Sequence, residues 1–351
     1  MAFDFKKNTM KKMIILLLVL TLVLALGLPG LLNAATAEST GTSVGVLSLM
    51  NMTEEEYLTW IRGKMVALLY LIGQGNYQSI NDIASAPPIK QVTFYDTLTD
   101  MVMGLQAGDI KIAELPECTA DYLCAHNDAL RVTGRFNLEG ADDFTTRLIY
   151  RLGVGYSFLM MEDRTALRDE LNQAIAAMKE DGTMDALINT CIVEGISEDP
   201  EPVEFTQADG ETIRMAVTGD LPPMDYVAPD GTPAGFNTAL LAELGRRLNK
   251  NFEIIQVTSV GRAAALASGQ VDLVFWTNGY DGRFPGSDPD ANTEDIVNEW
   301  KRSNTEEQNE VMESLNAGID SKKRRNKDIP EGTITTKPYF NDLIVTIAVK
   351  K

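Results

Sequence analysis

Apolar residues recur with two different periods along the chain, and these periods predict its elements. Residues 213–217 alternate apolar and polar side chains, which is typical of a strand, and the Gly- and Pro-containing residues 219–223 predict a turn directly after it. Leucines at helical spacing over residues 235–248 predict a helix that ends in a basic last turn. Asp220 is thereby left at the carboxyl end of a strand. Such a strand, turn and helix form the unit that builds ligand crevices in α/β sheets.

The same two patterns predict elements elsewhere. Residues 43–58 read as a short strand followed by a helix whose N-cap is Thr53. Residues 154–161 form an apolar strand, and an apolar stripe at helical spacing follows it in residues 164–192. The run 343–349 is again an apolar strand. Helices and strands alternate throughout, so we predict an α/β fold.

Two segments of the chain repeat one another. The run Leu105-Gln106-Ala107-Gly108-Asp109-Ile110 is echoed 161 positions later by Leu266-Ala267-Ser268-Gly269-Gln270-Val271, and a strand and a helix precede each run. Each copy then continues from a Gly-terminated turn into another strand. This echo predicts two lobes of similar architecture in one chain, with chance similarity of two βαβ units as the alternative.

The stretch VTGDLPPMDYVAPDGTPAGFNTALLAELGRRL, which begins at Val217, resembles a known family. Its Asp220, its Pro-Pro pair, Tyr226, Asp-Gly and Gly-Phe follow the order and spacing seen in type II extracytoplasmic solute-binding proteins of the polar amino-acid class. These proteins are the binding subunits of ABC importers. The resemblance implies a two-lobed periplasmic-binding-protein-like α/β fold of type II, with a cleft between the lobes.

The order of the segments differs from that family, in which the first lobe precedes the second. Here a second-lobe-like domain spans residues 43–150, and a crossing strand with closing helices, expected to pack on the later lobe, spans 151–196. A linker over 197–203 leads to a first-lobe-like domain over 204–351. We therefore expect a circular permutant that is broken at a surface connection.

Residues 1–37 carry a basic start, an apolar run and an Ala-x-Ala site, which is the pattern of a secretory signal peptide. An uncleaved membrane anchor is the alternative, and no Cys follows the run to favour a lipoprotein. Cleavage would take the net charge from −19 to −22. Such acidity argues against nucleic acid and an anionic membrane as partners, and it favours solubility in an exported compartment. We expect a monomer in the periplasm or outside the cell.

The inventory of reactive residues is small. Cys118 and Cys124 are close enough in sequence to form a disulfide, and two small buried residues with free thiols are an equal alternative. Cys191 makes the number of cysteines odd, so at least one is unpaired in a monomer. One histidine, His126, is too few for a His-based metal site or catalytic pair. We expect no metal, no cofactor and no enzymatic activity, although dehydratases use the same fold.

A charged insertion occupies residues 279–331 and departs from the family. Its few scattered apolar positions predict one or two exposed helices on the later lobe. The basic cluster at 322–327 is interpreted as a solvated face, because the rest of the protein is acidic.

An amino-acid zwitterion needs an anion for its ammonium group and a cation or a helix N-terminus for its carboxylate. The resemblance places Glu117 beside the family's ammonium-binding position and Arg283 near its carboxylate-binding Arg. A surface loop charge is the alternative for Arg283, and simple packing is the alternative to ligand stacking for Trp276. The expected ligand-binding residues are Asp220, Tyr226, Trp276, Thr277, Asn278 and Arg283 on the later lobe, and Asn51, Thr53 and Glu117 on the earlier one.

Two functional classes follow from the sequence. The first is a protein that binds a small polar solute, an amino acid or a similar molecule, and hands it to an ABC permease in the membrane. The second is an extracytoplasmic sensor or adaptor that uses the same fold without transport. An uncleaved anchor would favour the second.

Overall fold

The computed structural model of the protein describes residues 42–47, 64, 66–68, 70–79, 89–228, 230–279, 302–324 and 330–350. For residues 42, 77–79, 89–90, 277–279 and 317–324 only the backbone is described. The expected signal peptide at 1–37 lies outside these ranges, as do Asn51, Thr53 and Arg283.

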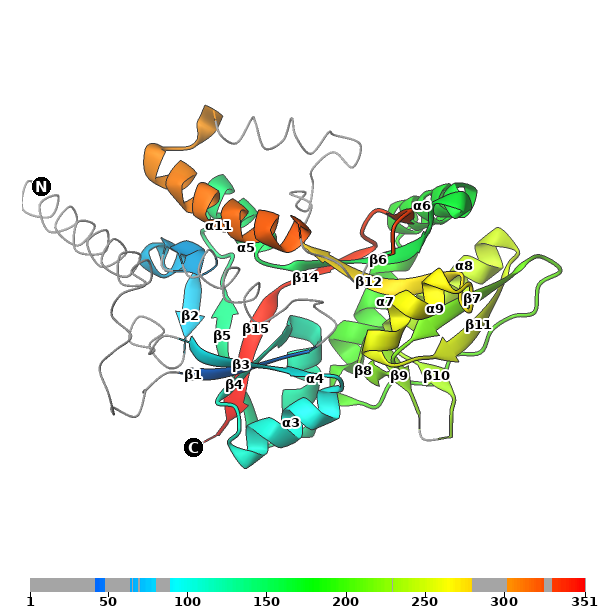
Figure 1. Ribbon diagram of the computed structural model, residues 1–351, viewed down its shortest axis with the longest axis horizontal. Coiled ribbons are helices and arrows are strands. Elements are labelled where there is room, and N and C mark those ends of the chain that lie inside the picture. The colour runs from blue at the N-terminus through cyan, green and yellow to red at the C-terminus, as the bar shows by residue number, and fades with distance from the viewer. Residues whose placement is uncertain are drawn as a thin grey trace, which may run out of the picture.

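The earlier lobe is built on a six-stranded sheet (Figure 1). Its strands are β1 (Thr42–Leu47), β2 (Tyr77–Ser79), β3 (Ile89–Tyr95), β4 (Ile112–Pro116), β5 (Leu130–Phe136) and β15 (Ile344–Val349). They lie in the order β2-β5-β15-β4-β1-β3, with β1 parallel to β3 and β4. The strand β15 runs antiparallel to β4 and β5. The helices of this lobe include α3 (Leu98–Ala107), α4 (Glu117–His126) and α5 (Asp143–Arg151).

The later lobe is built on a second sheet. Its strands are β6 (Val154–Met161), β7 (Thr212–Val217), β11 (Asn251–Gln256), β12 (Leu273–Gly279), β13 (Thr333–Thr335) and β14 (Phe340–Asp342). The order is β11-β7-β12-β6-β13, and β14 also pairs with β6. A small sheet beside it contains β8 (Asp220–Leu221), β9 (Asp225–Val227) and β10 (Pro233–Ala234). Its helices include α6 (Thr165–Glu180), α7 (Thr183–Ile188), α8 (Phe236–Leu248) and α9 (Arg262–Ala267).

The two sheets share one order of strands, although β2 has no counterpart in the later sheet. In each, a central strand, β1 or β7, has parallel neighbours on both sides, and one of those neighbours pairs with an antiparallel strand, β15 or β6. The sequence echo occupies equivalent places, because β3, α3 and β4 match β11, α9 and β12. Gly108 and Gly269 close the paired helices with φ values of 86° and 70°. The prediction of two similar βαβ units is thus confirmed.

Each sheet receives its antiparallel strand from the other half of the chain. The strand β6 follows α5 of the earlier lobe, and β15 follows β14 of the later lobe. The strand that begins at residue 344 therefore lies in the earlier lobe, although the sequence analysis assigned all of 204–351 to the later one. The reason is that β15 lies between β4 and β5 in the sheet, where Val345 and Ile347 are buried in the core of the earlier lobe. The two crossings adjoin, since Asp342 pairs with Val154.

The helices α6 and α7 pack on α8 of the later lobe. Their buried side chains Leu171, Ile175 and Met178 share a cluster with Leu240 and Phe236. Gly182 has φ 80° and separates the two helices. A buried stripe at helical spacing therefore covers one face of the later sheet.

The charged insertion contains α11 (Glu306–Arg324), which packs on the earlier lobe beside α5 (Figure 1). Val311, Met312 and Leu315 are buried there. The expectation of an exposed helix on the later lobe is wrong for α11. Its apolar side chains lie on one side of the helix, and a neighbouring helical surface was available to cover them.

Candidate functional site

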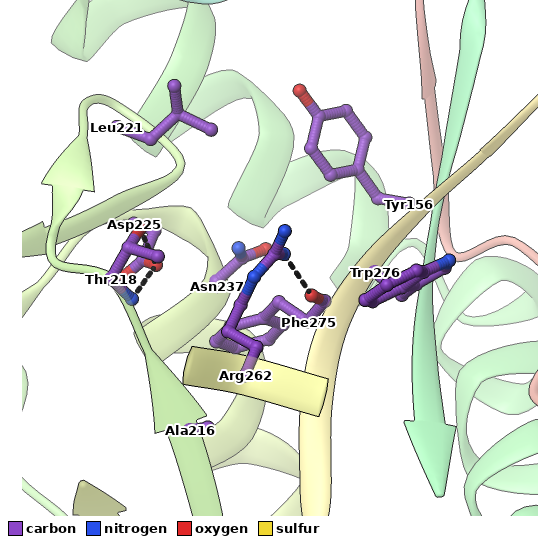
Figure 2. Close-up of a pocket in the computed structure, with 9 residues that line it drawn as sticks. All are labelled: Tyr156, Ala216, Thr218, Leu221, Asp225, Asn237, Arg262, Phe275 and Trp276. Atoms are coloured by element: carbon purple, nitrogen blue, oxygen red, sulfur yellow. Dashed lines mark hydrogen bonds between the residues drawn. The ribbon is translucent and has the colours of Figure 1, made fainter. Parts of the chain in front are cut away.

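A small cavity lies at the carboxyl ends of β7 and β12 in the later lobe. Its volume is about 30 Å³, and its walls include Thr218, Asp225, Arg262, Trp276 and Tyr156 (Figure 2). The chain leaves β7 for β11 on one side and enters β12 on the other, so the cavity lies where the strand order reverses. This is the place at which ligands bind in open α/β sheets.

Arg262 provides a buried positive charge at this cavity. Its side chain extends from the start of α9 toward the space between the Asp225 side of the cavity and Tyr156 (Figure 2). Only 5% of the residue is exposed. Burial lowers its pKa to about 10, and the nearby Asp225 and Asp220 oppose that shift. The guanidinium is therefore charged at neutral pH.

The contacts of Arg262 leave one nitrogen free among the described residues. Its Nε donates to the Ser259 carbonyl and its Nη1 to the Phe275 carbonyl, both at 3.1 Å. The guanidinium carbon lies 5.1 Å from the centre of the Trp276 ring, which is a cation–π geometry. Nη2 is buried and has no hydrogen-bond partner within the part of the chain that the structure describes. A buried charged donor of this kind can bind an anionic oxygen.

Two acidic residues of the β8–β9 segment lie near Arg262. Asp225 is buried, and its Oδ2 accepts from the Thr218 amide at 2.9 Å and from the Thr218 hydroxyl at 3.1 Å. Burial raises the pKa of Asp225, and the hydrogen bonds from Thr218 and Gly219 oppose the shift. The site therefore combines one buried cation with two nearby acidic side chains.

Tyr156 contributes a second polar atom. It belongs to β6, the strand that crosses between the lobes, and its ring is almost fully buried. Its hydroxyl has no hydrogen-bond partner among the described residues, and burial raises its pKa well above the ordinary value. The phenol stays protonated and can donate to an oxygen of a ligand.

The two lobes touch beside this cavity. The Leu98 amide at the start of α3 donates to Asp220 Oδ2 at 3.1 Å, and the Ser259 hydroxyl donates to the Asp96 carbonyl at 2.9 Å. Leu221 is buried in the core cluster of the earlier lobe together with Met101. The β8 end of the later lobe is thus docked on α3, beside a cavity whose volume of about 30 Å³ is small for a solute.

The structure spreads the sequence-predicted ligand residues over several environments. Trp276 lines the cavity, and Asp220 takes part in the contact between the lobes. Tyr226 lies in β9 opposite Asp220. Glu117 does not line the cavity, because its carboxylate pairs with Arg135 Nη1 at 2.7 Å.

The remaining predicted residues give less information. Thr277 and Asn278 lie at the end of β12, opposite Tyr156 and Gly155 of β6, and only their backbone is described. Asn51, Thr53 and Arg283 lie outside the described residues. The thiols of Cys118, Cys124 and Cys191 are free, so the proposed pairing is not formed.

Sequence reasoning missed Arg262, Asp225 and Tyr156. A usable signal existed for Arg262, because it is the one charged residue in the otherwise apolar helix Arg-Ala-Ala-Ala-Leu-Ala. A charge inside such a segment requires a buried partner or a ligand. Tyr156 gave no signal, since it lies in a uniformly buried strand.

No helix within the described ranges has the length and hydropathy that crossing a membrane requires. In the same ranges, no group of three or more His, Cys, Asp or Glu side chains is arranged to hold a metal ion.

Residues 213–325, about one third of the chain, match a family described as bacterial extracellular solute-binding proteins, family 3. This segment contains Asp220, Asp225 and Arg262. No curated protein matches the chain.

Solved structures with similar folds include NikA from Staphylococcus aureus in complex with Ni(L-His)2, at 12% identity and TM-score 0.34, covering 74% of this chain and 57% of NikA. The alkanesulfonate-binding protein SsuA from Xanthomonas axonopodis pv. citri, bound to MOPS, has 10% identity and TM-score 0.33, with 86% and 88% covered. The GluR0 ligand-binding core with L-glutamate has 8% identity and TM-score 0.34, with 90% and 87% covered. This chain thus spans little more than half the length of NikA. Residues 213–325 are thus similar to the bacterial extracellular solute-binding proteins, family 3, and the chain as described has a two-lobed α/β architecture.

Proposed function

We propose that the protein is an extracytoplasmic solute-binding protein that carries an amino acid or a similar small polar solute to an ABC permease. The observation that carries this proposal is Arg262, a buried cation with a free Nη2 at the carboxyl ends of β7 and β12. It lies inside the segment that matches the solute-binding family. An anionic group of the solute would accept from Nη2 and from the Tyr156 hydroxyl.

The charges at the site favour a zwitterion over a simple anion. Asp220 and Asp225 lie close enough to affect the pKa of Arg262, so a dianion would meet repulsion from both carboxylates. A solute with an ammonium group would gain from them instead. Asp220 is the better candidate for this contact, because the described hydrogen bonds of Asp225 already hold Thr218.

Closure must follow binding if the solute enters this cavity. Ligand pockets usually enclose roughly 300–1,000 Å³, far more than the cavity seen here. The contact between Asp220 and the Leu98 amide would therefore have to open before a solute enters. The solute would then replace that contact in the closed form, and hinge closure would bury it.

Native mass spectrometry of protein purified without refolding tests the proposal by detecting a co-purified metabolite. Calorimetry with a panel of amino acids would then show micromolar or tighter binding for at least one of them. Two variants separate the possible ammonium contacts. If Glu117 binds the ammonium group, as the sequence resemblance implies, Glu117→Ala weakens binding by about 1.5–3 kcal/mol. If Asp220 binds it, as the cavity favours, Asp220→Asn weakens binding instead. A panel without any binding would refute the proposal.

A sensor or adaptor is a second candidate function. It is favoured by the contact between the lobes, which forms without a solute. Small-angle scattering distinguishes the two functions, because a hinge-closing transport protein should lose radius of gyration when its solute is added. Unchanged scattering at saturating solute would favour the sensor or adaptor.

We also infer that the chain order is a circular permutation. The strands β15 and β1 flank β4, and because β15 is antiparallel to it and β1 parallel, β15 ends at the edge of the sheet where β1 begins. Two strand spacings, about 10 Å, separate them, so a short loop could join residues 350 and 42. A protein rejoined there and opened in the linker 197–203 should fold with similar stability. Failure of the rejoined chain to fold would argue against the permutation.

The matched family is extracellular, which supports the expected periplasmic or secreted location. A cleaved signal peptide at residues 1–37 and a monomeric state complete the proposal. N-terminal sequencing of the exported protein tests the first, and sedimentation analysis tests the second.

A further inference from the structure

The insertion helix α11 belongs to the later lobe in sequence and to the earlier lobe in packing. The chain leaves the later sheet at the end of β12 and re-enters it at β13, which pairs with β6. Between these two strands it contributes α11 to the core of the earlier lobe. The insertion therefore joins the lobes in addition to the two crossings at β6 and β14–β15.

The packing of α11 is that of a core element. Leu315 is fully buried, and Val311 and Met312 are 6% and 5% exposed. They share one cluster with Leu148 and Ile149 of α5, and with apolar side chains of residues 66–68 and 70–72. Gln308 adds a hydrogen bond of 3.3 Å to the Tyr70 hydroxyl. Val311, Met312 and Leu315 thus form an apolar stripe that is buried against the earlier lobe, as in an amphipathic helix packed on a core.

The hydrogen bonds of α11 reach the hinge itself. Arg151, the last residue of α5, donates from Nε and Nη2 to Asn316 Oδ1 at 3.1 and 2.6 Å. Two residues later, Gly153 leads into β6, and a Cβ there would lie 2.4 Å from the Asp342 carbonyl in the other crossing. The helix α11 therefore holds the segment from which the crossing strand starts.

We propose that α11 is a strap that restrains the separation of the two lobes. When the lobes open, β12 and β13 move with the later lobe while α11 stays packed on the earlier one. Opening then moves β12 and β13 of the later sheet away from α11, to which the chain joins them.

The strap predicts that weakening α11 packing opens the lobes without any solute. The Leu98 amide reports this opening directly. It is the first residue of α3, where an amide has no acceptor within its own helix, and its partner is Asp220 across the lobe contact. Its hydrogen exchange in the full chain therefore rises in proportion to the open fraction.

The test compares two leucines that are equally buried. Leu315→Ala loosens the strap, whereas Leu240→Ala removes the same atoms from α8 in the later lobe, where no strap is involved. We expect Leu315→Ala to raise Leu98 exchange by at least about tenfold, and Leu240→Ala to change it less than about threefold. If Leu315→Ala does not fold, Asn316→Ala is judged by the same criterion, since it removes only the acceptor of Arg151.

Several results would overturn the proposal. Exchange of Leu98 that is equal in wild type and Leu315→Ala would mean that α11 does not restrain the lobes. Equal acceleration by Leu240→Ala would show a general loss of stability rather than a strap. A Leu98 amide without protection in the wild type would also refute it. None of these results depends on a solute, so the strap can fail while solute binding stands.

Discussion

Replacing Arg262 by Gln tests the proposed site most directly, because it removes the charge and keeps a polar side chain. The lowering of the Arg262 pKa from 12.5 to about 10 means that holding the charge costs about 3 kcal/mol. Two hydrogen bonds from a charged donor to carbonyls contribute about 1.5–3 kcal/mol each, and the desolvated contact with Trp276 adds about 2 kcal/mol. The contacts with the two carbonyls and with Trp276 hold the buried guanidinium in place.

Gln can restore one neutral hydrogen bond, so Arg262→Gln should lower the free energy of unfolding by about 1–4 kcal/mol. A domain with ordinary stability remains folded after such a loss. Besides this loss of stability, the affinity for the solute should fall, because the solute loses one charge-assisted hydrogen bond of about 1.5–3 kcal/mol. That loss corresponds to a dissociation constant raised roughly 10- to 150-fold.

The assay is titration calorimetry with the solute identified by native mass spectrometry, and thermal unfolding checks that the variant is folded. Arg214→Gln is the matched control. It neutralises an Arg in β7 whose partner is Asp272, a pair outside the cavity lining, and it should leave binding unchanged. If Arg262→Gln binds as tightly as the wild type, the assignment of the cavity to an anionic group is wrong.

Further predictions concern closure, pH and the core. Asp220→Asn should speed hydrogen exchange of the Leu98 amide about fivefold, because a neutral acceptor replaces a carboxylate at a helix N-terminus and is weaker by about 1 kcal/mol; unchanged exchange would contradict this. Hydrogen bonds from Arg246 and Arg247 lower the pKa of Glu243 from 4.5 to about 2. Ionised Glu243 therefore stabilises the folded state above pH 4.5, and this stabilisation is lost as the pH falls toward 2. Glu243→Gln should therefore cost about 1–2 kcal/mol in urea unfolding at pH 7, and the difference should disappear near pH 2. Phe158→Ala empties a fully buried position in β6 and should cost about 3–5 kcal/mol in the same measurement, and a loss below 1 kcal/mol would refute this packing.

The local periodicity of the sequence was enough to predict most elements. The strand β6 spans the predicted residues 154–161, and α6 buries the predicted stripe that includes Leu171 and Ile175. The repeat at an offset of 161 positions predicted two similar units, and the two sheets contain them in equivalent places. These features were readable because each depends on neighbours within a few residues along the chain.

The composition of the site depended on contacts between distant segments. Arg262 becomes a buried charge only because the Phe275 carbonyl and the Trp276 ring of β12 lie against it. Glu117 is half-buried and paired because β5 places Arg135 beside it. A sequence motif can name the residue types of a site, but it cannot show which of them find partners elsewhere.

The sequence by itself determined that this chain has two related α/β units, that it carries a solute-binding family segment, and that an inserted charged segment interrupts the later unit. Only the tertiary structure decided which lobe the insertion joins. Val311, Met312 and Leu315 show that α11 has an apolar side, and that pattern is the same whichever surface covers it. The choice of partner follows from which surface lies within reach and can bury that side, and this depends on how the lobes are arranged in space.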